Sequence, residues 1–466
     1  MSNLRPCRCV RKGLAHAASG PATGFVSCTM ATTTHDATGP DTIETLKARR
    51  VCGIADALVG SEILKIAGDV RALVANGRDI CNLTVGDFSP SEFRIPEMLE
   101  RGIVEALHRG ETNYPPSDGT LPLREAIRSF YRRELGFTPD LASVIVTAGS
   151  RPGIYATFTA LIDPGDRVVY PTPSWNNNHY VHLSAARGIV VPCDAASNFL
   201  PTRESLADAV RGARVLALCS PLNPSGTAFT AAALRSICEL VVEENARRGV
   251  GERPLYLMYD QVYWTLTFGD THHVHPIGVC PDVAPYTVYI DGISKAFAAT
   301  GVRVGWIVAP PDVAGPMSGL LGHIGAWAPR AEQSAVASLL GDAGDMHAYR
   351  TKMIVGLRER LDLLHDGIAA MQSVKCPVEV LAPEGAIYLS ARFALTGRRT
   401  LDGALLATDE DVRQYLLKAA GVAIVPFQAF GVREDTGWFR LSVGAVSPEQ
   451  IARMLPRLRQ AIEATA

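Results

Sequence analysis

The sequence has no strong excess of charge of either sign. Its 45 Lys and Arg residues nearly balance 47 Asp and Glu residues, which leaves a net charge of -2 at pH 7 in a chain of 466 residues. Such a chain has no large positive field to attract nucleic acid or an anionic membrane surface. We therefore expect neither nucleic acid nor a membrane as a partner, and small-molecule chemistry fits the composition better.

Long apolar runs and several common enzyme motifs are also missing. No uninterrupted apolar stretch approaches the ~20 residues that a membrane-spanning helix needs, which predicts a soluble protein, and we expect it in the cytoplasm. The sequence contains no GxxxxGK[ST] segment, no GxGxxG run and no HExxH segment. Three common classes of nucleotide-binding and zinc enzymes therefore lose their usual sequence support.

Cysteine and histidine form no recognisable framework or metal motif. The ten cysteines are scattered along a large chain, and the one close pair is Cys7 and Cys9, so we expect reduced and mostly buried thiols. The histidines His272, His273 and His275 are clustered, but no partner motif with ligand spacing accompanies them. This favours a surface loop over a metal site.

The N-terminal segment differs from the rest of the chain. It is rich in Ala, Thr, Ser and Gly and carries no acidic residue before Asp36, as a transit peptide does. The alternative, which we favour, is a start codon assigned too early, because Met30 opens an ordinary polar leader. In either case we expect disorder over residues 1–41. Residues 42–95 would then form an N-terminal arm and part of a small domain.

Short runs rich in Val, Ile and Tyr alternate with helical stretches in the centre of the chain. Examples are SVIVTAG followed by RPGIYATFTALI, and RVLALCSP followed by AAALRSICELVVEENARRG. This alternation predicts an α/β fold. We expect a large domain over residues 96–329, with a mainly parallel seven-stranded sheet between helices. A smaller α/β domain would combine residues 330–466 with the N-terminal segment.

Polar residues follow the predicted strands, where ligands bind in open parallel sheets. Each has an ordinary structural explanation alone, such as capping a helix or filling the core. Their common position at strand exits indicates one site. These residues are Gly149, Ser150, Arg151, Trp175, Asn223, Asp260, Tyr263, Ser294, Lys295 and Arg303.

The set matches what pyridoxal 5'-phosphate requires: an amine, an anion beside its pyridine nitrogen, and donors for its phosphate. Lys295 can supply the amine and Asp260 the anion. Asn223 and Tyr263 can bond to the phenolic oxygen of the ring, and Trp175 can stack on its face. The phosphate can be held by Ser150, Ser294 and Arg303.

The motifs that carry these residues resemble a known family. The order SPLNPSG, YDQVY, DGISKAFAATGVRVGW and WFRLSVG is similar to fold type I, class I/II aminotransferases, close to the aspartate aminotransferase family. The segments NLTVGDF and NYPPSDGTLPLREAI add to the likeness. The resemblance extends from about Ile54 to the C-terminus.

The resemblance implies a role for each matching residue. Lys295 is the Schiff-base lysine and general base, with a pKa lowered by its surroundings, and Asp260 and Tyr263 support it in catalysis. Arg440 binds the α-carboxylate of the substrate, Gly86 leaves room for it, and Trp175 and Asn223 line the same space. The phosphate is surrounded by Gly149, Ser150, Arg151, Ser294 and Arg303, with Tyr114 reaching over from the second subunit of a homodimer.

The sequence departs from the family pattern at several positions. Gln261 stands where the family usually has Glu, Asn178 where an aromatic residue is common, and Phe427 where Gly is usual. The run Asn176 to His179 is placed to line the pocket and alter substrate choice. The sequence identifies no second arginine for a side-chain carboxylate, so it does not support aspartate as the substrate.

The predicted function is reversible transfer of an amino group between an L-amino acid and a 2-oxo acid. A β-lyase or decarboxylase on the same scaffold is one alternative, because the fold and cofactor do not determine which bond is broken. A non-catalytic regulatory module that binds the cofactor is another. The complete set of Lys295, Asp260 and Arg440 argues against the regulatory module.

Overall fold

The computed structural model describes residues 51–58, 60 and 62–466 of the chain. The predictions for residues 1–41 lie outside the described residues. Residues Gly53–Ala466 form one compact unit.

A seven-stranded sheet forms the centre of this unit, with the strand order β2-β8-β7-β6-β5-β3-β4. Strand β8 runs antiparallel to both β2 and β7, and the other pairs are parallel. The prediction of a mainly parallel sheet between helices is therefore confirmed. The strands are β2 (Val144–Thr147), β3 (Arg167–Thr172), β4 (Arg187–Pro192), β5 (Ala213–Cys219), β6 (Tyr256–Asp260), β7 (Thr287–Gly292) and β8 (Gly305–Val308).

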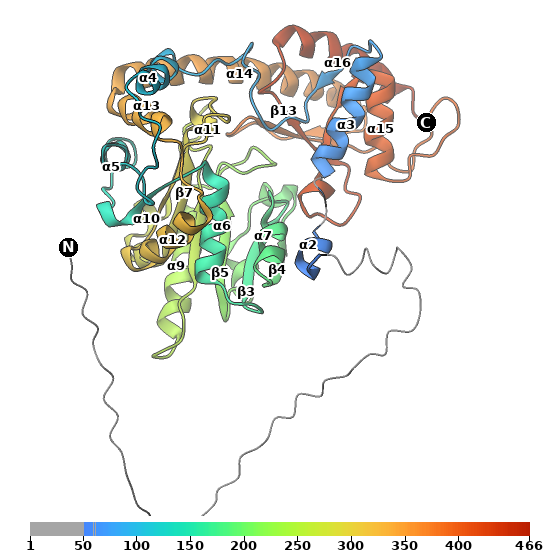
Figure 1. Cartoon of the computed structure of the whole chain (residues 1–466). Helices are drawn as coiled ribbons and strands as arrows, with labels where there is room; N and C mark the ends of the chain where they lie inside the picture. The colour runs from blue at the N-terminus through green and yellow to red at the C-terminus, as the bar shows by residue number, and fades with distance from the viewer. Residues whose placement is uncertain (1–50, 59, 61) are drawn as a thin grey trace, which may run out of the picture. The chain divides into compact units, whose positions relative to one another are not determined.

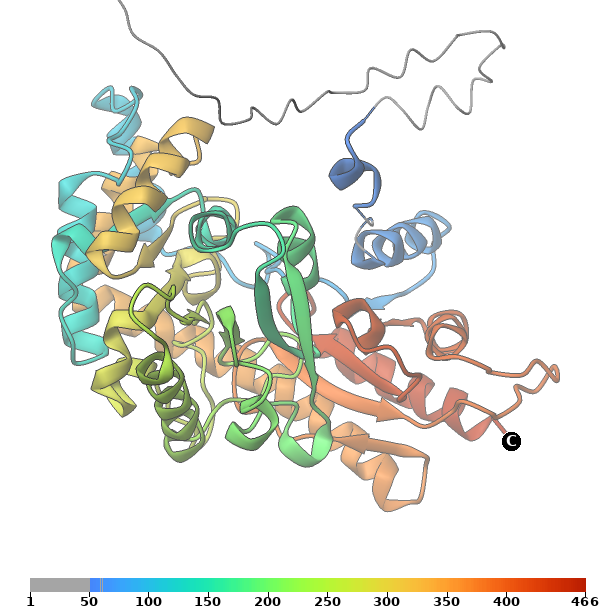
Figure 2. The ribbon, with the colours of Figure 1, turned by 90° about the horizontal axis from the view of Figure 1, so that it is seen from below.

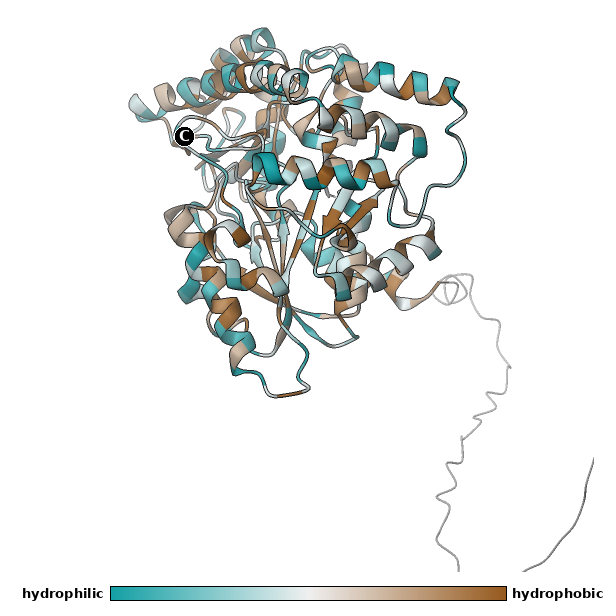
Figure 3. Cartoon of the chain, turned by 90° about the vertical axis from the view of Figure 1, so that its left-hand side faces the viewer, coloured by the Kyte–Doolittle hydropathy of each residue, from teal (hydrophilic) through white to brown (hydrophobic). Residues whose placement is uncertain are grey.

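Helices cover both faces of this sheet because its strands bury apolar side chains on both sides. Successive residues face opposite ways: Val215 packs with one helical layer, and Leu216 packs with the other. The first layer contains α6 (Ser150–Leu161), α7 (Asn177–Leu183) and α12 (Pro311–Ile324). The second contains α5 (Leu121–Glu134), α9 (Ala231–Arg247) and α13 (Arg330–Gly341), and α4 (Glu97–His108) packs against α13. Figure 3 shows the apolar strands between helices of mixed hydropathy.

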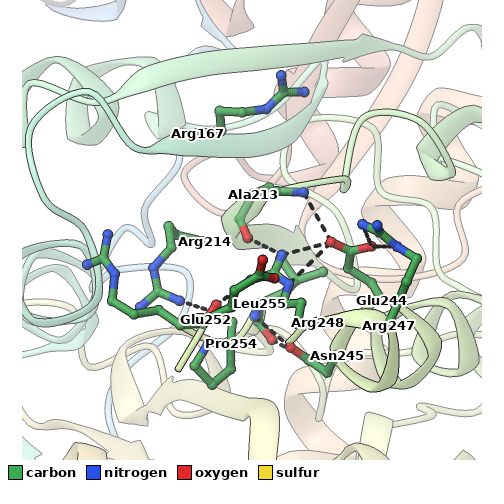
Figure 4. A network of polar contacts seen from close by, with 12 residues as sticks. Arg167, Ala213, Arg214, Glu244, Asn245, Arg247, Arg248, Glu252, Pro254 and Leu255 are labelled. Carbon is green, nitrogen blue, oxygen red and sulfur yellow. Dashed lines mark hydrogen bonds and ion pairs between the residues drawn. The ribbon is translucent and has the colours of Figure 1, made fainter. Parts of the chain in front are cut away.

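A buried polar network fastens α9 at the edge of the sheet where β5 and β6 begin (Figure 4). Glu244, only 4% exposed, accepts hydrogen bonds from Arg247 at 2.7 Å and from Arg248 at 3.0 Å. Arg248 also donates to the carbonyl of Ala213, the first residue of β5, at 2.6 Å. Buried charge is tolerated here because each carboxylate oxygen has a cationic donor.

A second, antiparallel sheet has the order β12-β13-β10-β9. A two-stranded parallel pair, β1 with β11, adjoins it. Three helices pack their apolar faces on this part: α14 (Ala343–Ser373), α15 (Asp409–Ala420) and α16 (Pro448–Glu463). The strands are β1 (Cys81–Asn82), β9 (Val378–Val380), β10 (Tyr388–Phe393), β11 (Val422–Ala423), β12 (Val425–Pro426) and β13 (Trp438–Ser442).

The first long helix of the described chain packs with the C-terminal helices. This helix is α3 (Glu62–Ala75), in which Ile66 and Val70 are buried. Val70 packs against Leu417 of α15. Figures 1 and 2 show α3 beside α15. The N-terminal and C-terminal segments therefore share one core.

The remaining elements are short. They are α2 (Gly53–Asp56), α8 (Arg203–Leu206), α10 (Pro276–Val279) and α11 (Ile293–Ala296), with 3-10 turns at Leu141–Ser143, Ala195–Ser197, Pro281–Tyr286 and Phe427–Phe430. Across the described part of the chain, no helix combines the length and apolar character needed to cross a membrane.

Candidate active site

A cavity of about 800 Å³ opens at the carboxyl ends of β5, β6 and β7. The site residues predicted from sequence come together here, with two exceptions. Gly149 and Tyr114 do not line the cavity. Those that do are Gly86, Ser150, Arg151, Trp175, Asn223, Asp260, Tyr263, Ser294, Lys295, Arg303 and Arg440.

Lys295 enters the cavity from α11, the short helix that follows β7. Its amine donates a hydrogen bond of 2.6 Å to the carbonyl oxygen of Gly86 and lies 5.9 Å from the centre of the Tyr263 ring. Burial lowers the pKa of Lys295 to about 8, and the charge of Asp87 only partly offsets this effect. The amine is therefore much closer to neutrality at physiological pH than an ordinary lysine, as we expected.

Asp260 ends β6 and faces the same cavity. Burial raises the pKa of its carboxyl to about 6, although the Val262 N–H, at 3.2 Å, and the charge of Lys295 act in the opposite direction. A partly buried carboxylate of this kind is well suited to a cationic ring nitrogen, because each charge would offset the desolvation of the other.

Arg303 and Gly149 fit together beside the N-terminus of α6. The Arg303 guanidinium donates to the carbonyls of Thr300 at 2.7 Å and Ala148 at 2.8 Å. Gly149 has a φ of 82°, and a Cβ there would lie 2.2 Å from Nη2 of Arg303. Gly149 thus serves the site from behind the arginine, without lining the cavity itself. Ser150 and Ser294 line the same cavity as Arg303.

Arg440, on β13, is 1% exposed and lies between two aromatic rings. Its guanidinium carbon is 4.7 Å from the ring centre of Tyr388 and 4.8 Å from that of Phe430. It donates to Oδ1 of Asn223 at 3.1 Å and to the carbonyl of Thr84 at 2.7 Å, and its Nε has no hydrogen-bond partner among the described residues. A buried guanidinium with unused donor capacity suits a carboxylate ligand.

Gly86 lies directly beside this arginine. A Cβ at Gly86 would lie 3.0 Å from the hydroxyl of Tyr388 and 3.5 Å from Nη1 of Arg440. Any larger residue would therefore fill the space in front of the guanidinium. Tyr388 also shares a hydrogen bond of 2.6 Å with the hydroxyl of Tyr263, which connects the arginine side of the cavity with the lysine side.

The outer wall of the cavity is aromatic and polar. Arg151 lies over the ring of Trp175, with 4.6 Å between the guanidinium carbon and the ring centre. Of the run predicted to line the pocket, Asn176, Asn177 and His179 line the cavity next to them, whereas Asn178 does not. Stacking on Trp175 directs the Arg151 guanidinium toward this outer wall.

The cavity as a whole is suited to an anionic ligand. Lys295, Arg151, Arg303 and Arg440 all line it, and none of them takes part in an ion pair formed by the described residues. Only Asp87 and Asp260 bring negative charge to its lining. A ligand that carries a phosphate and a carboxylate would balance these cations.

Asp87 and Tyr388 are polar lining residues to which sequence reasoning assigned no role. Asp87 accepts a hydrogen bond of 2.6 Å from Thr300, and its only sequence signal is its place directly after Gly86. Tyr388 begins β10, and nothing in the run AIYLSARF distinguishes it from a core residue. Both reach the cavity through contacts distant in sequence.

Tyr114 and the histidine cluster lie outside the cavity lining. Tyr114 exposes 81% of its surface and packs edge-on against Trp327, with ring centres 5.4 Å apart. The surface-loop interpretation is wrong for His275, which is 7% exposed and interacts with the Tyr289 hydroxyl at 3.1 Å. His272 is exposed. The described residues contain no group of three or more potential metal ligands.

None of the three departures from the family pattern lines the cavity. Asn178 is exposed on α7, whereas Phe427 is 1% exposed and packs edge-on against Phe199 at 5.0 Å. Gln261 is fully buried, one residue after Asp260.

Comparisons with known proteins agree with this geometry. The family model for aminotransferase class I and II matches residues 78–458. The chain is 32% identical to an aspartate aminotransferase of Rhizobium meliloti (strain 1021), an alignment that covers 86% of this chain and 94% of that enzyme. It is 29% identical to the aspartate aminotransferase of Geobacillus stearothermophilus, over 88% and 98% of the two chains.

Solved structures show the same fold. The crystal structure of the Rhizobium meliloti aspartate aminotransferase superposes with a TM-score of 0.81 at 30% identity, covering 90% of this chain and all of that one. The Thermus thermophilus aspartate aminotransferase with maleate superposes with a TM-score of 0.78 at 26% identity, over 89% and 100% of the chains.

Proposed function

The chain belongs to the aminotransferase class I and II family, and we propose that the cavity described above is its active site, with Lys295 as the residue that attaches the cofactor. The protein is a pyridoxal-phosphate-dependent transaminase that moves an amino group between an L-amino acid and a 2-oxo acid. When bound, pyridoxal 5'-phosphate supplies an aldehyde for the amine and an electron-withdrawing ring for the α-carbon.

One observation carries the assignment of the site. A single enclosed lysine, with its pKa lowered to about 8, shares a cavity with the carboxylate of Asp260 and with the guanidinium groups of Arg303 and Arg440. The amine, the anion and two separate cations are the groups that the cofactor and an amino acid together require. The space in front of Gly86 further supports the fit.

Different residues would bind different parts of the cofactor. Asp260 would pair with the pyridine nitrogen, and Asn223 and Tyr263 would bond to the phenolic oxygen. Trp175 would cover the ring. The phosphate would be held by Ser150, Ser294 and Arg303, with Gly149 allowing Arg303 to approach and Tyr114 of the partner subunit completing the set.

Two residues act on the substrate itself. Arg440 would bind the α-carboxylate through two parallel N–H groups, which orients the α-carbon. Lys295, once displaced from the cofactor by the substrate amine, would take the α-proton on its Nζ and return it at the end of the transfer. A pKa of about 8 suits this task, because a base is most effective when its pKa is near the working pH.

We propose an acidic amino acid as the substrate class. The relatives named above are aspartate aminotransferases, and the solved Thermus thermophilus enzyme is with maleate, a dicarboxylate. Arg151 supports this proposal in the present chain: it lines the cavity, forms no ion pair with a described carboxylate, and is held on Trp175. Its guanidinium would bind the side-chain carboxylate.

The test is a substrate screen on purified protein loaded with pyridoxal 5'-phosphate. Each amino acid would be offered with 2-oxoglutarate, except glutamate, which would be offered with oxaloacetate, and the 2-oxo acid product measured. We expect aspartate or glutamate to exceed alanine at least tenfold in kcat/KM. Release of pyruvate or carbon dioxide without transfer of the amino group would favour the β-lyase or decarboxylase alternative instead.

We also propose a homodimer and a cytoplasmic location. The highly exposed Tyr114, held against Trp327, supports the dimer, because an exposed aromatic side chain is typical of a contact surface. The described cysteines, all free, support a reducing compartment. Sedimentation should give about twice the chain mass of 49.9 kDa, and a monomer at micromolar concentration would contradict the dimer.

A further inference from the structure

A carboxylate is buried behind the active site, on the penultimate residue of β7. Asp291 is 1% exposed and accepts four hydrogen bonds, all from neutral donors. The donors are the Gly292 N–H at 2.7 Å, the Tyr131 hydroxyl at 2.9 Å, Nε1 of Trp264 at 3.0 Å and Nε2 of Gln261 at 3.3 Å. We call Tyr131, Gln261, Trp264 and Asp291 the Asp291 cluster.

No cation pairs with this carboxylate among the described residues. The titratable and charged groups that face the cluster include His273, which interacts with Oε1 of Gln261 at 3.3 Å, and Arg350, whose guanidinium carbon lies 5.6 Å from the Trp264 ring. The Tyr289 ring lies 6.4 Å from the Tyr131 ring. Arg350 is itself paired with Glu134 at 2.7 Å. Burial raises the pKa of Asp291 to about 7. Such a group is tolerated only where several fixed donors surround it.

The cluster is attached to the two strand ends that carry the reacting groups. Gln261 directly follows Asp260, and Gly292 begins the turn that leads through α11 to Lys295. Tyr131 is held in turn by Nε1 of Trp306, at 3.0 Å, on β8. Hydrogen bonds to one carboxylate therefore join the ends of β6 and β7 to α5 and β8.

The identity of residue 261 fits this arrangement. Its amide nitrogen lies 3.3 Å from Oδ2 of Asp291, so a glutamate at 261 would place two buried carboxylates against each other. The two positions can hold one carboxylate between them, and in this chain it is on Asp291. The amide of Gln261, where the family usually has a carboxylate, is thus matched by the carboxylate of Asp291 on the neighbouring strand β7.

We propose that Asp291 is a positioning residue, a buried anion whose hydrogen bonds set the relative placement of Asp260 and Lys295. The inference rests on the proposed roles of these two residues. Asp291 faces away from the cavity and touches neither substrate nor cofactor; it acts through Gln261 and the Gly292 backbone.

The main variant is Asp291→Asn, which keeps the shape but presents an NH2 group either to the Gly292 N–H or to the three side-chain donors. We expect kcat to fall at least tenfold with KM for the amino acid within threefold. The pH midpoint of the visible absorbance of the bound cofactor should shift by at least half a unit. The double variant Gln261→Glu/Asp291→Asn places the carboxylate on residue 261 and the amide on residue 291, so the pair can still form a hydrogen bond. It should recover most of the lost kcat and return the absorbance midpoint most of the way to its wild-type value.

Glu244→Gln is the matched control, because Glu244 is also a buried carboxylate of the same unit. Its network lies where the strands begin, whereas Asp291 lies where β7 ends. The Glu244→Gln change should lower thermal stability while leaving the kcat and the absorbance midpoint unchanged. If Asp291→Asn behaves in the same way, Asp291 has a structural role only and the proposal is overturned. Failure of the double variant to recover activity would also overturn it.

Tyr131→Phe keeps the test decisive if Asp291→Asn does not fold. It removes one donor from the carboxylate, and we expect the same shift of the absorbance midpoint with about a threefold loss of kcat. An unchanged midpoint would contradict the proposal. The wild type is first checked for transamination and for cofactor attached to Lys295, so that an error in the proposed function is recognised separately.

Discussion

The amine of Lys295 and the carbonyl oxygen of Gly86 lie 2.6 Å apart, although 209 positions separate them in the chain. The same glycine leaves the space in front of Arg440, whose Nη1 would be 3.5 Å from a Cβ at this position. One backbone segment therefore contacts both the group that we assign to the cofactor and the group that we assign to the substrate carboxylate. Their separation is set by a backbone, which is more rigid than two long side chains.

The lowered pKa of Lys295 predicts how the apoenzyme takes up its cofactor. Only the neutral amine attacks an aldehyde, so the rate of attachment should rise about tenfold per pH unit at low pH and level off above pH 8. Stopped-flow absorbance between pH 6 and 9.5 measures this midpoint. A rate that still rises steeply above pH 9.5 would mean that the amine has the pKa of an ordinary lysine.

Arg440→Ala should affect the substrate far more than the cofactor. The change removes a buried, bidentate partner of the α-carboxylate at a cost of ~3 kcal/mol or more, roughly a 100-fold loss of kcat/KM. The Kd for pyridoxal 5'-phosphate should change by less than about threefold, because Arg440 is assigned to no cofactor atom. Unchanged amino-acid kinetics would mean that the carboxylate binds elsewhere.

Arg151→Gln should reduce activity only for acidic substrates. A hydrogen bond to a charged partner is worth about 1.5 kcal/mol, so kcat/KM for aspartate should fall roughly tenfold. The value for alanine, which has no side-chain carboxylate, serves as the internal control and should stay constant. Equal losses for both amino acids would place Arg151 on the cofactor, as the sequence motif suggested.

Gly149→Ala tests the contact with Arg303. The new Cβ would lie 2.2 Å from Nη2 of Arg303, so the guanidinium must move, and cofactor affinity should fall at least tenfold. Gly165→Ala is the control because Gly165 also has a positive φ, 87°, but has no atom within 4 Å of the new Cβ. Both variants carry the backbone strain, of about 1 kcal/mol or more. Equal cofactor affinities in the two variants would contradict a role for Gly149 at the phosphate.

The sequence was most informative where the signal is local. Apolar runs of five to seven residues gave β5, β6 and β7, and the polar residues after them were found in one cavity because parallel strands end at the same edge. Gly86 and Arg440 came from the family resemblance, since neither follows a strand of the main sheet.

Tertiary contacts explain what the sequence did not reveal. Tyr388 joins the site through its hydroxyl contact with Tyr263, 125 positions away, and no local pattern marks it. His275 was misassigned because a cluster of histidines looks polar, whereas its ring is buried against Tyr289 and the carbonyl of Leu135. The anionic role of Asp291 depends on donors from Tyr131 and Trp264, which only the fold brings together.

The most direct test of the account is borohydride reduction of the enzyme loaded with pyridoxal 5'-phosphate, followed by digestion and mass spectrometry. We predict that the cofactor is trapped on the peptide that contains Lys295 and on no other. Lys295→Ala should bind the cofactor without a borohydride-stable link and should not transaminate. Labelling of any other lysine, or near-normal transamination by Lys295→Ala, would contradict the assignment of this cavity as the active site.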